Sequence, residues 1–203
     1  MNPPTRLLLV RHGEVEERYR QVFGGRIDMG LSAHGHAQAR ILADHLGRQP
    51  VQAIYASPMK RAQLTLAPFI ERHPVRPVIL PELREVDFGA WTGCTWQEVR
   101  DRFHVHAFDW LEKLEANAIP EAEPVAQFRD RVADSLGRVL RESAGGCAAV
   151  VAHGGVIRML LALLLDLPLR KMASFEIAYA SLTRVDHRPG RVEVQFLNRV
   201  LES

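Results

Sequence analysis

Residues 6–13 read RLLLVRHG, and this stretch decides the fold. Residues 6–10 are short and almost wholly apolar, which is typical of a strand buried on both faces of a parallel sheet. Arg11, His12 and Gly13 follow at once, so the strand ends in residues suited to contact a ligand. Because ligands bind at the carboxyl ends of such strands, we expect a functional site here.

A second stretch repeats this arrangement far along the chain. Residues 148–152 read AAVVA, and His153 and Gly154 follow them in a predicted tight turn. Residues 156–165 then continue as an apolar helix that stops before Pro168. The sequence therefore predicts a second strand whose end carries a histidine.

Two further units of strand and helix lie between or beside these stretches. Residues 51–55 read VQAIY and predict a strand, after which Ser57 and the proline behind it start a helix that runs through Ile70. An earlier helix is predicted to begin after Ser32 as its N-cap and to stop at Gly47. Strands thus alternate with helices along the first part of the chain.

The remaining segments complete the expected architecture. They are a short strand at 78–80, a loop at 82–93, helices at 96–114 and 125–140, and strands at 175–185 and 191–197. The turn Arg188-Pro189-Gly190 joins the last two strands in an antiparallel hairpin at the sheet edge. We therefore expect an α/β fold, a three-layer α/β/α sandwich with a mostly parallel central sheet and an antiparallel edge strand, formed by residues 1–203 as one domain.

Composition limits the classes of partner. Of the 203 residues, 47% are hydrophobic and 25% are charged, which is ordinary for a globular protein. The formal net charge is +2, which is too small and too evenly spread to indicate nucleic acid or an anionic membrane as the main partner. Any anion must therefore be bound by a local cluster of positive groups.

No targeting segment or disulfide is expected. The apolar run at residues 7–10 is too short for a signal peptide, and residues 148–165 contain His153 and an arginine, which hydrocarbon would penalise. Cys94 and Cys147 lie far apart and fit no paired pattern of metal or redox spacing. We expect a cytoplasmic protein with free thiols.

The polar residues at strand ends suit phosphoryl chemistry. A phosphoryl group carries charge on three oxygens throughout its transfer, so a site needs fixed positive donors and a positioned nucleophile. Arg11 and Arg61 can supply planar pairs of donors, and His12 can attack phosphorus as a neutral imidazole. His153 can then donate to a phosphoryl oxygen, and Glu85 can serve both as acid and as base.

The glycines beside these residues let the backbone approach an anion. Gly13, Gly154 and Gly155 carry no Cβ, and the helix that begins near Gly155 directs its positive end toward the site. Taken singly, each histidine would be read as structural, and Arg61 and Glu85 as solvated surface residues. Only their combination indicates catalysis.

Several blocks of sequence, in order, resemble one known family. They are LLLVRHGEV, GGRID, LSAHGHAQA, SPMKRAQLT, ELREVDFGAWTG and VVAHGG, and together they span nearly the whole chain. This order is similar to that of the histidine phosphatase superfamily, which includes the phosphoglycerate mutases. The resemblance implies a phosphoglycerate mutase-like fold and an enzyme that works without metal or cofactor on a small phosphorylated metabolite, and it leaves a homodimer open.

The resemblance also assigns roles to residues of this chain. It implies that His12 is phosphorylated and that Glu85 is the proton donor. The phosphate pocket would comprise Arg11, Arg61 and His153, with lesser contributions to substrate binding from Gly13, Arg18, Gly24, Ser57 and Gly154.

Two positions depart from the family pattern. Arg18 stands where the family commonly has an asparagine that helps bind phosphate, and Val15 stands where a threonine or serine is usual. The rim of the pocket and the substrate contacts in this loop therefore cannot be copied from the family.

Other candidate sites have weaker support. His34 with His36, and His104 with His106, are alternate-residue pairs joined by no cysteine or carboxylate cluster, so we expect no metal site. Aromatic residues are structural by default, but Trp91, Trp96 and Trp110 could line an apolar substrate site, and of these we favour Trp91.

Three functions remain open on sequence alone. The first is hydrolysis of a small phosphomonoester, and the block GGRIDMGLS with the overall length is similar to the α-ribazole phosphatases. The second is a phosphoglycerate mutase, although the segment between Glu85 and His153 is shorter than the insertion that covers the substrate in such mutases. The third is a non-catalytic phosphoryl-binding regulator, which the complete set of pocket residues disfavours.

Overall fold

A computed structural model of the chain describes residues 3–106 and 109–201. The strands are β1 (Thr5–Arg11), β2 (Ala53–Ala56), β3 (Pro77–Ile79), β4 (Cys147–Ala152), β5 (Leu182–Arg188) and β6 (Arg191–Arg199). The α-helices are α1 (Ala33–Gly47), α2 (Lys60–Ile70), α3 (Trp96–Phe103), α4 (Trp110–Glu115), α5 (Val125–Glu142) and α6 (Gly154–Leu164). Short 3₁₀ helices lie at Glu17–Tyr19, Pro81–Leu83, Gly89–Trp91 and Leu169–Ser174.

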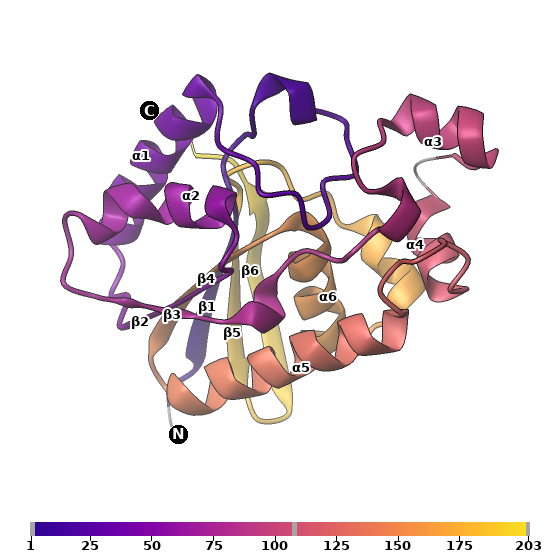
Figure 1. Cartoon of the computed structure of the whole chain (residues 1–203). Helices are drawn as coiled ribbons and strands as arrows, with labels where there is room; N and C mark the ends of the chain where they lie inside the picture. Colours follow the sequence, from indigo (N-terminus) through magenta and orange to yellow (C-terminus); the bar gives the residue numbers. More distant parts are fainter. Residues whose placement is uncertain (1–2, 107–108, 202–203) are drawn as a thin grey trace.

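The six strands form one mixed sheet in the order β3-β2-β4-β1-β5-β6. The first four are parallel to one another, whereas β5 runs antiparallel to β1 and pairs with β6 in an antiparallel hairpin. Helices α1 and α2 lie against one face, and α5 and α6 lie against the other (Figure 1). The expected α/β/α sandwich with a mostly parallel sheet and antiparallel edge is confirmed.

The alternation of side chains along β1 builds a core on each face of the sheet. Leu8 and Val10 belong to the cluster that α1 and α2 cover, whereas Leu7 and Leu9 belong to the larger cluster beneath α5 and α6. All four side chains are almost fully buried. A strand buried on both faces explains why residues 6–10 are apolar without alternation.

The register of the central strands fixes the position of the two histidines. In the parallel pair β1 and β4, Arg11 is paired with Ala152, so His12 and His153 are the next residues of neighbouring strands. The backbone N–H of His12 donates to the carbonyl of Ala152 over 3.0 Å, which extends the ladder by one step. Both histidines therefore emerge at the same edge of the sheet.

The helix expected at residues 96–114 is two helices, so that prediction was wrong. Thr95 begins α3 with a capping box, and His104 ends it in the left-handed conformation (φ 55°). The second helix, α4, starts only at Trp110. A non-glycine residue ending a helix in this conformation leaves little trace in the sequence, because the apolar period continues across it.

The strand expected at residues 175–185 begins only at Leu182. Ala180 has φ 52°, and the N–H of Ala178 donates to Oδ1 of Asn198 over 2.6 Å instead of joining a strand ladder. Residues 175–181 thus form a loop. The start of α2 also differs, because the helix begins at Lys60, whose N–H is capped by Oδ1 of Asp28 at 2.8 Å.

No helix within residues 3–106 and 109–201 is long and apolar enough to cross a membrane. Cys94 and Cys147 are both buried, and neither forms a disulfide with a described residue.

Candidate active site

His12 lies directly after β1 with only 4% of its surface exposed. Its Nδ1 lies 2.8 Å from the carbonyl oxygen of Gly13, and since a carbonyl can only accept, Nδ1 carries the proton. The other ring nitrogen, Nε2, accepts a hydrogen bond from Nε of Arg61 at 3.2 Å. The ring is thus held as one neutral tautomer with its lone pair on Nε2.

Arg61 projects from the first turn of α2 and is 2% exposed. Its Nε–H is shared between Nε2 of His12 and Nδ1 of His153, at 3.2 and 3.1 Å. Its terminal nitrogens donate to the carbonyls of Ile27 at 2.8 Å and Gly25 at 3.1 Å. Burial lowers the pKa of Arg61 to about 10, so the guanidinium remains charged near neutral pH.

His153 is fully buried at the N-terminus of α6. Because its Nδ1 accepts from Arg61, its Nε2 carries the proton and donates to Oγ of Ser57 at 2.8 Å. The two histidine rings lie 5.2 Å apart between centroids. Burial, and then the charge of Arg61, hold the pKa values of both histidines well below the usual value, so both are neutral.

Arg11 ends β1 and contacts the loop at residues 175–181. Its Nη1 donates to the carbonyl of Ile177 at 2.6 Å, and its guanidinium lies 3.9 Å from the centroid of the Tyr179 ring. Its Nε is buried and has no hydrogen-bond partner among the described residues. An unsatisfied buried donor of this kind is costly unless a ligand engages it.

Glu85 follows the 3₁₀ helix Pro81–Leu83 and faces the start of α6. Its Oε2 accepts from the N–H of Gly155 at 3.2 Å, and its Oε1 accepts from the N–H of Val86 at 3.1 Å. A Cβ at position 155 would lie 2.6 Å from Oε1, so the carboxylate occupies space that only glycine leaves open. Gly155 therefore donates a hydrogen bond to the Glu85 carboxylate and also leaves the space that this carboxylate occupies.

These residues open onto one cavity of about 790 Å³. Its polar end is formed by Arg11, His12, Arg61, Glu85, Gly154, Gly155 and Arg158. The aromatic wall of the cavity comprises the lining residues Tyr19, Phe23, Phe88, Trp96, Trp110 and Phe175. The lining can therefore contact an anion through the arginines and an apolar group through the aromatic rings.

Not every expected residue lines this cavity. Gly24 does, whereas His153 and Ser57 do not: His153 accepts a hydrogen bond from Arg61, and Ser57 in turn accepts one from His153. Gly13 is not among the lining residues either, and its N–H donates to Oγ1 of Thr65 at 2.8 Å.

Two further candidate residues, Arg18 and Trp91, do not line the cavity. The Arg18 side chain is 71% exposed, pairs with Glu16 at 3.4 Å and is not among the lining residues, because the 3₁₀ turn Glu17–Tyr19 presents Tyr19 to the cavity instead. Trp91 is 1% exposed within the core, where the turn Gly89–Trp91 places it against Phe23.

The lining residues that sequence reasoning missed include Arg158 and Tyr179. Arg158 lies on α6 one turn beyond Gly154, and its Nε donates to the carbonyl of Phe175 at 2.8 Å. The spacing from Gly154 was a usable signal, because residues four apart share one face of a helix. Tyr179 carried none, since it was placed in a strand.

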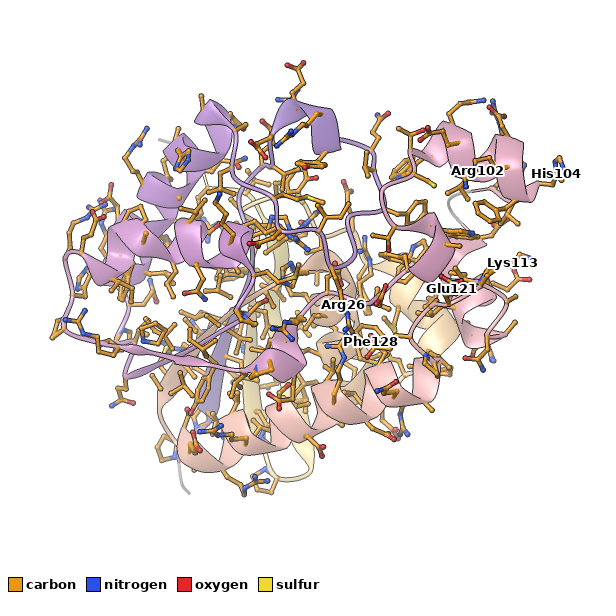
Figure 2. All side chains as sticks on the ribbon, viewed as in Figure 1. Arg26, Arg102, His104, Lys113, Glu121 and Phe128 are labelled. Atoms are coloured by element: carbon orange, nitrogen blue, oxygen red, sulfur yellow. The ribbon has the colours of Figure 1, made fainter. Side chains whose placement is uncertain are left out.

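Among the described residues, neither histidine pair belongs to a cluster that could bind a metal ion. His104 lies at the outer end of α3 (Figure 2). Within the described part of the chain, no group of three or more histidine, cysteine, aspartate or glutamate residues could bind a metal ion.

Comparison with known proteins decides the family. The family model described as histidine phosphatase superfamily (branch 1) matches residues 7–200, which include every residue of the polar end of the cavity. The chain belongs to the histidine phosphatase superfamily. The family resemblance found in the sequence is therefore confirmed.

Individual relatives of this histidine phosphatase are also phosphatases. Phosphoserine phosphatase 1 of Hydrogenobacter thermophilus is 30% identical over 194 residues, covering 96% of this chain and 92% of that protein. The adenosylcobalamin/α-ribazole phosphatase of Salmonella typhimurium is 30% identical over 197 residues, covering 95% and 96%. The solved structure of a putative α-ribazole-5′-P phosphatase from Escherichia coli superposes with a TM-score of 0.86 at 25% identity, with 98% of each chain covered. The enzyme class is confirmed, whereas the substrates named differ.

Proposed function

We propose that this chain hydrolyses a small phosphomonoester through a phosphohistidine at Nε2 of His12. The observation that carries the proposal is the placement of a neutral His12, with its lone pair on Nε2, against the charged Arg61 at 3.2 Å. A nucleophile and a cation that stabilises transferring charge thus share one point of the cavity.

In the first half of the reaction, Nε2 of His12 attacks phosphorus. As the N–P bond forms, the bond from phosphorus to the alcohol oxygen breaks, and its electron pair goes to that oxygen. The protonated carboxyl of Glu85 gives the oxygen a proton, so the alcohol leaves neutral. Arg11 and Arg61 bind the phosphoryl oxygens, and the unpaired Nε of Arg11 gains a partner.

In the second half, water attacks the phosphohistidine. Glu85, now a carboxylate, takes a proton from the water as its oxygen bonds to phosphorus. The N–P bond breaks, its electron pair returns to Nε2 of His12, and inorganic phosphate leaves. Glu85 and His12 are restored to their starting states, so one carboxyl serves both steps.

The aromatic wall supports a substrate with a planar, apolar part. The ring centroids of Phe88 and Trp110 lie 5.5 Å apart and those of Phe23 and Phe88 lie 5.0 Å apart, both edge to face. These contacts hold the rings of the aromatic wall in place. Aromatic walls favour flat rings over small polar groups. α-Ribazole 5′-phosphate, the substrate class named for one relative, carries such a ring, and we propose it over phosphoserine.

We further propose that the reaction needs no metal ion. Arg11, Arg61 and Arg158 supply fixed positive charge at the polar end, which is the contribution a metal makes in other phosphoryl-transfer sites. Activity that disappears on chelation and returns with metal would contradict this proposal.

We also propose that residues 1–203 act as one domain. Residues from Arg11 to Tyr179 contribute to one cavity, which supports a single functional unit.

The test is a panel of three phosphomonoesters, α-ribazole 5′-phosphate, phosphoserine and 3-phosphoglycerate, with His12→Gln as control. We expect release of phosphate from the first with the highest kcat/KM and no release by the variant. Conversion of 3-phosphoglycerate to its isomer without phosphate release would instead identify a mutase. Binding without turnover of any substrate would identify a non-catalytic protein.

A matched pair of substrates tests the aromatic wall. Trp110→Ala is expected to raise KM for α-ribazole 5′-phosphate about tenfold, which corresponds to about 1.4 kcal/mol of lost ring contact. Glycerol phosphate, which has no ring, should be hydrolysed by the variant as by the parent chain. Equal effects on both substrates would remove the wall from substrate selection.

A further inference from the structure

A largely buried ion pair, Glu123 with the partly exposed Arg131, lies beside the loop that carries Glu85. Glu123 is 6% exposed, and its two carboxylate oxygens accept from Nε and Nη2 of Arg131 at 2.6 and 2.8 Å. Arg131 lies on α5, whereas Glu123 precedes that helix. The guanidinium thus binds the carboxylate through two hydrogen bonds, an arrangement that fixes the orientation of both groups.

The remaining donors of Arg131 all go to the backbone around Glu85. Nη1 donates to the carbonyls of Glu82 and Arg84, the latter at 2.7 Å. Nη2 donates to the carbonyl of Glu85 itself at 3.3 Å. All five N–H groups of the guanidinium therefore donate hydrogen bonds. Three of these bonds hold backbone carbonyls of the short segment 82–85.

Glu123 holds the other side of the same segment. Its Oε2 accepts from the N–H of Asp87 at 3.4 Å, and its own N–H donates to the carbonyl of Asp87 at 3.0 Å. The backbone is thus bound before Glu85 by Arg131 and after Glu85 by Glu123.

A second contact ties this loop to the chain that leads into α5. The N–H of Ala90 donates to the carbonyl of Pro120 at 2.9 Å. Gly89 has φ +52°, and a Cβ there would lie 2.2 Å from that same carbonyl oxygen. The two backbones therefore meet at a distance that only glycine allows.

The pair is itself anchored to the core. The Arg131 guanidinium lies 4.8 Å from the centroid of the Phe128 ring, one turn earlier on α5. Phe128 is fully buried and points from α5 toward the interior (Figure 2). The anchor of the Glu85 segment is consequently a rigid helix packed on the sheet.

The Glu85 side chain needs such an anchor. Its carboxylate has no ion-pair partner among the described residues and accepts only two backbone N–H groups, those of Val86 and Gly155. Its position therefore depends on where the backbone at residue 85 is held. Buried ion pairs contribute little net stability compared with apolar residues of similar size, so geometry is the better reason for this one.

We propose that Arg131 and Glu123 are positioning residues for the proton donor Glu85. The pair touches no part of the cavity and acts by fixing the backbone on which Glu85 sits. This inference rests on the proposed function, since it requires that Glu85 protonates the leaving alcohol.

The experiment compares kcat/KM for leaving groups that do and do not need a proton. kcat/KM reports the step in which the alcohol leaves, and 4-nitrophenol leaves as an anion whereas an alkyl alcohol does not. Glu85→Gln is expected to lower kcat/KM for an alkyl phosphate on the order of 10²-fold or more, the usual contribution of a general acid, and to leave 4-nitrophenyl phosphate within about tenfold. This variant calibrates the readout.

Arg131→Lys should reproduce the same selectivity in weaker form. Lysine keeps the charge but cannot bridge the carboxylate and the carbonyls together, so we expect roughly a tenfold loss for the alkyl phosphate and less than about threefold for 4-nitrophenyl phosphate. A buried Glu123 carboxylate without its partner would destabilise the chain, so the double variant Glu123→Leu/Arg131→Met removes both charges at once. This variant should remain folded and show the same selective loss. Arg138→Met, which breaks an exposed pair on the same helix, should change neither substrate.

The outcomes separate the two proposals. If Glu85→Gln affects both substrates equally, the role of Glu85 in the proposed function is wrong. If Glu85→Gln is selective but Arg131→Lys and the folded double variant lower both substrates equally, or neither, the positioning role is wrong. Selective loss in all three variants supports both.

Discussion

The Nε–H of Arg61 is shared between Nε2 of His12 and Nδ1 of His153, at 3.2 and 3.1 Å. A charged donor therefore already faces the atom that we propose to attack phosphorus. When a phosphoryl group arrives, its oxygens can take over this donor as the lone pair of His12 is released to phosphorus. The same contact that keeps the nucleophile neutral thus provides the charge that stabilises transfer.

Arg61→Lys is expected to lower kcat/KM on the order of 10²-fold or more, because an ammonium cannot reach both imidazoles and the carbonyls of Gly25 and Ile27 from one position. Steady-state kinetics with 4-nitrophenyl phosphate measures the effect. Arg72→Lys, which alters an exposed pair just beyond α2, is the control and should behave as the parent chain. An Arg61→Lys enzyme within threefold of the parent would remove Arg61 from the reaction.

Gly155→Ala is expected to displace the Glu85 carboxylate, since the added Cβ would lie 2.6 Å from Oε1. The loss should be larger for alkyl phosphates than for 4-nitrophenyl phosphate, roughly tenfold or more, because the proton donor is moved and the phosphate site is not. Gly137→Ala on α5 meets only the flexible end of Arg141 and is the matched control. Uniform loss on all substrates would contradict this account of Gly155.

The free energy of unfolding should fall as the pH drops below about 6.5, the ordinary pKa of histidine. His12 and His153 have lowered pKa values in the folded chain, so the unfolded chain binds protons first and each contributes a slope of about 1.4 kcal/mol per pH unit. Urea unfolding at pH values between 7.5 and 5.5 measures the total slope. His12→Gln should reduce it by about one histidine's share, and an unchanged slope would show that His12 is protonated in the folded state.

Arg18→Ala is expected to leave kcat and KM within about twofold of the parent values, because surface substitutions away from a site have small effects. The side chain is 71% exposed and pairs with Glu16 outside the cavity. The same panel of phosphomonoesters provides the measurement. A KM that rises severalfold for every substrate would restore Arg18 as a phosphate contact.

The fold and the centre of the site could be predicted because they depend on strand ends. His12 and His153 each follow an apolar run, and parallel neighbours in a sheet bring such ends together without further information. Arg61 and Glu85 could be identified only from their combination with these strand-end residues and from the family resemblance. Neither has local periodicity or spacing that separates it from a surface residue.

The errors have a common physical origin in single backbone conformations. His104 and Ala180 both adopt positive φ. At His104 this ends the expected helix early, and at Ala180 it replaces part of the expected strand with a loop that lines the cavity. The 3₁₀ turns at Glu17–Tyr19 and Gly89–Trp91 decide which neighbour faces the cavity, and they turned Arg18 outward and Trp91 inward. Sequence patterns average over several residues and do not resolve such rotations.

The most direct test of the central claim is to trap the phosphoenzyme and locate its phosphoryl group. Glu85→Gln, mixed with 4-nitrophenyl phosphate, should accumulate the intermediate, because its formation needs no acid but its hydrolysis needs a base. After an alkaline quench, peptide mass spectrometry should place one phosphoryl group on His12, lost on acid treatment and absent from His12→Gln/Glu85→Gln. A phosphoryl group on any other residue, or turnover that survives His12→Gln, would contradict the account.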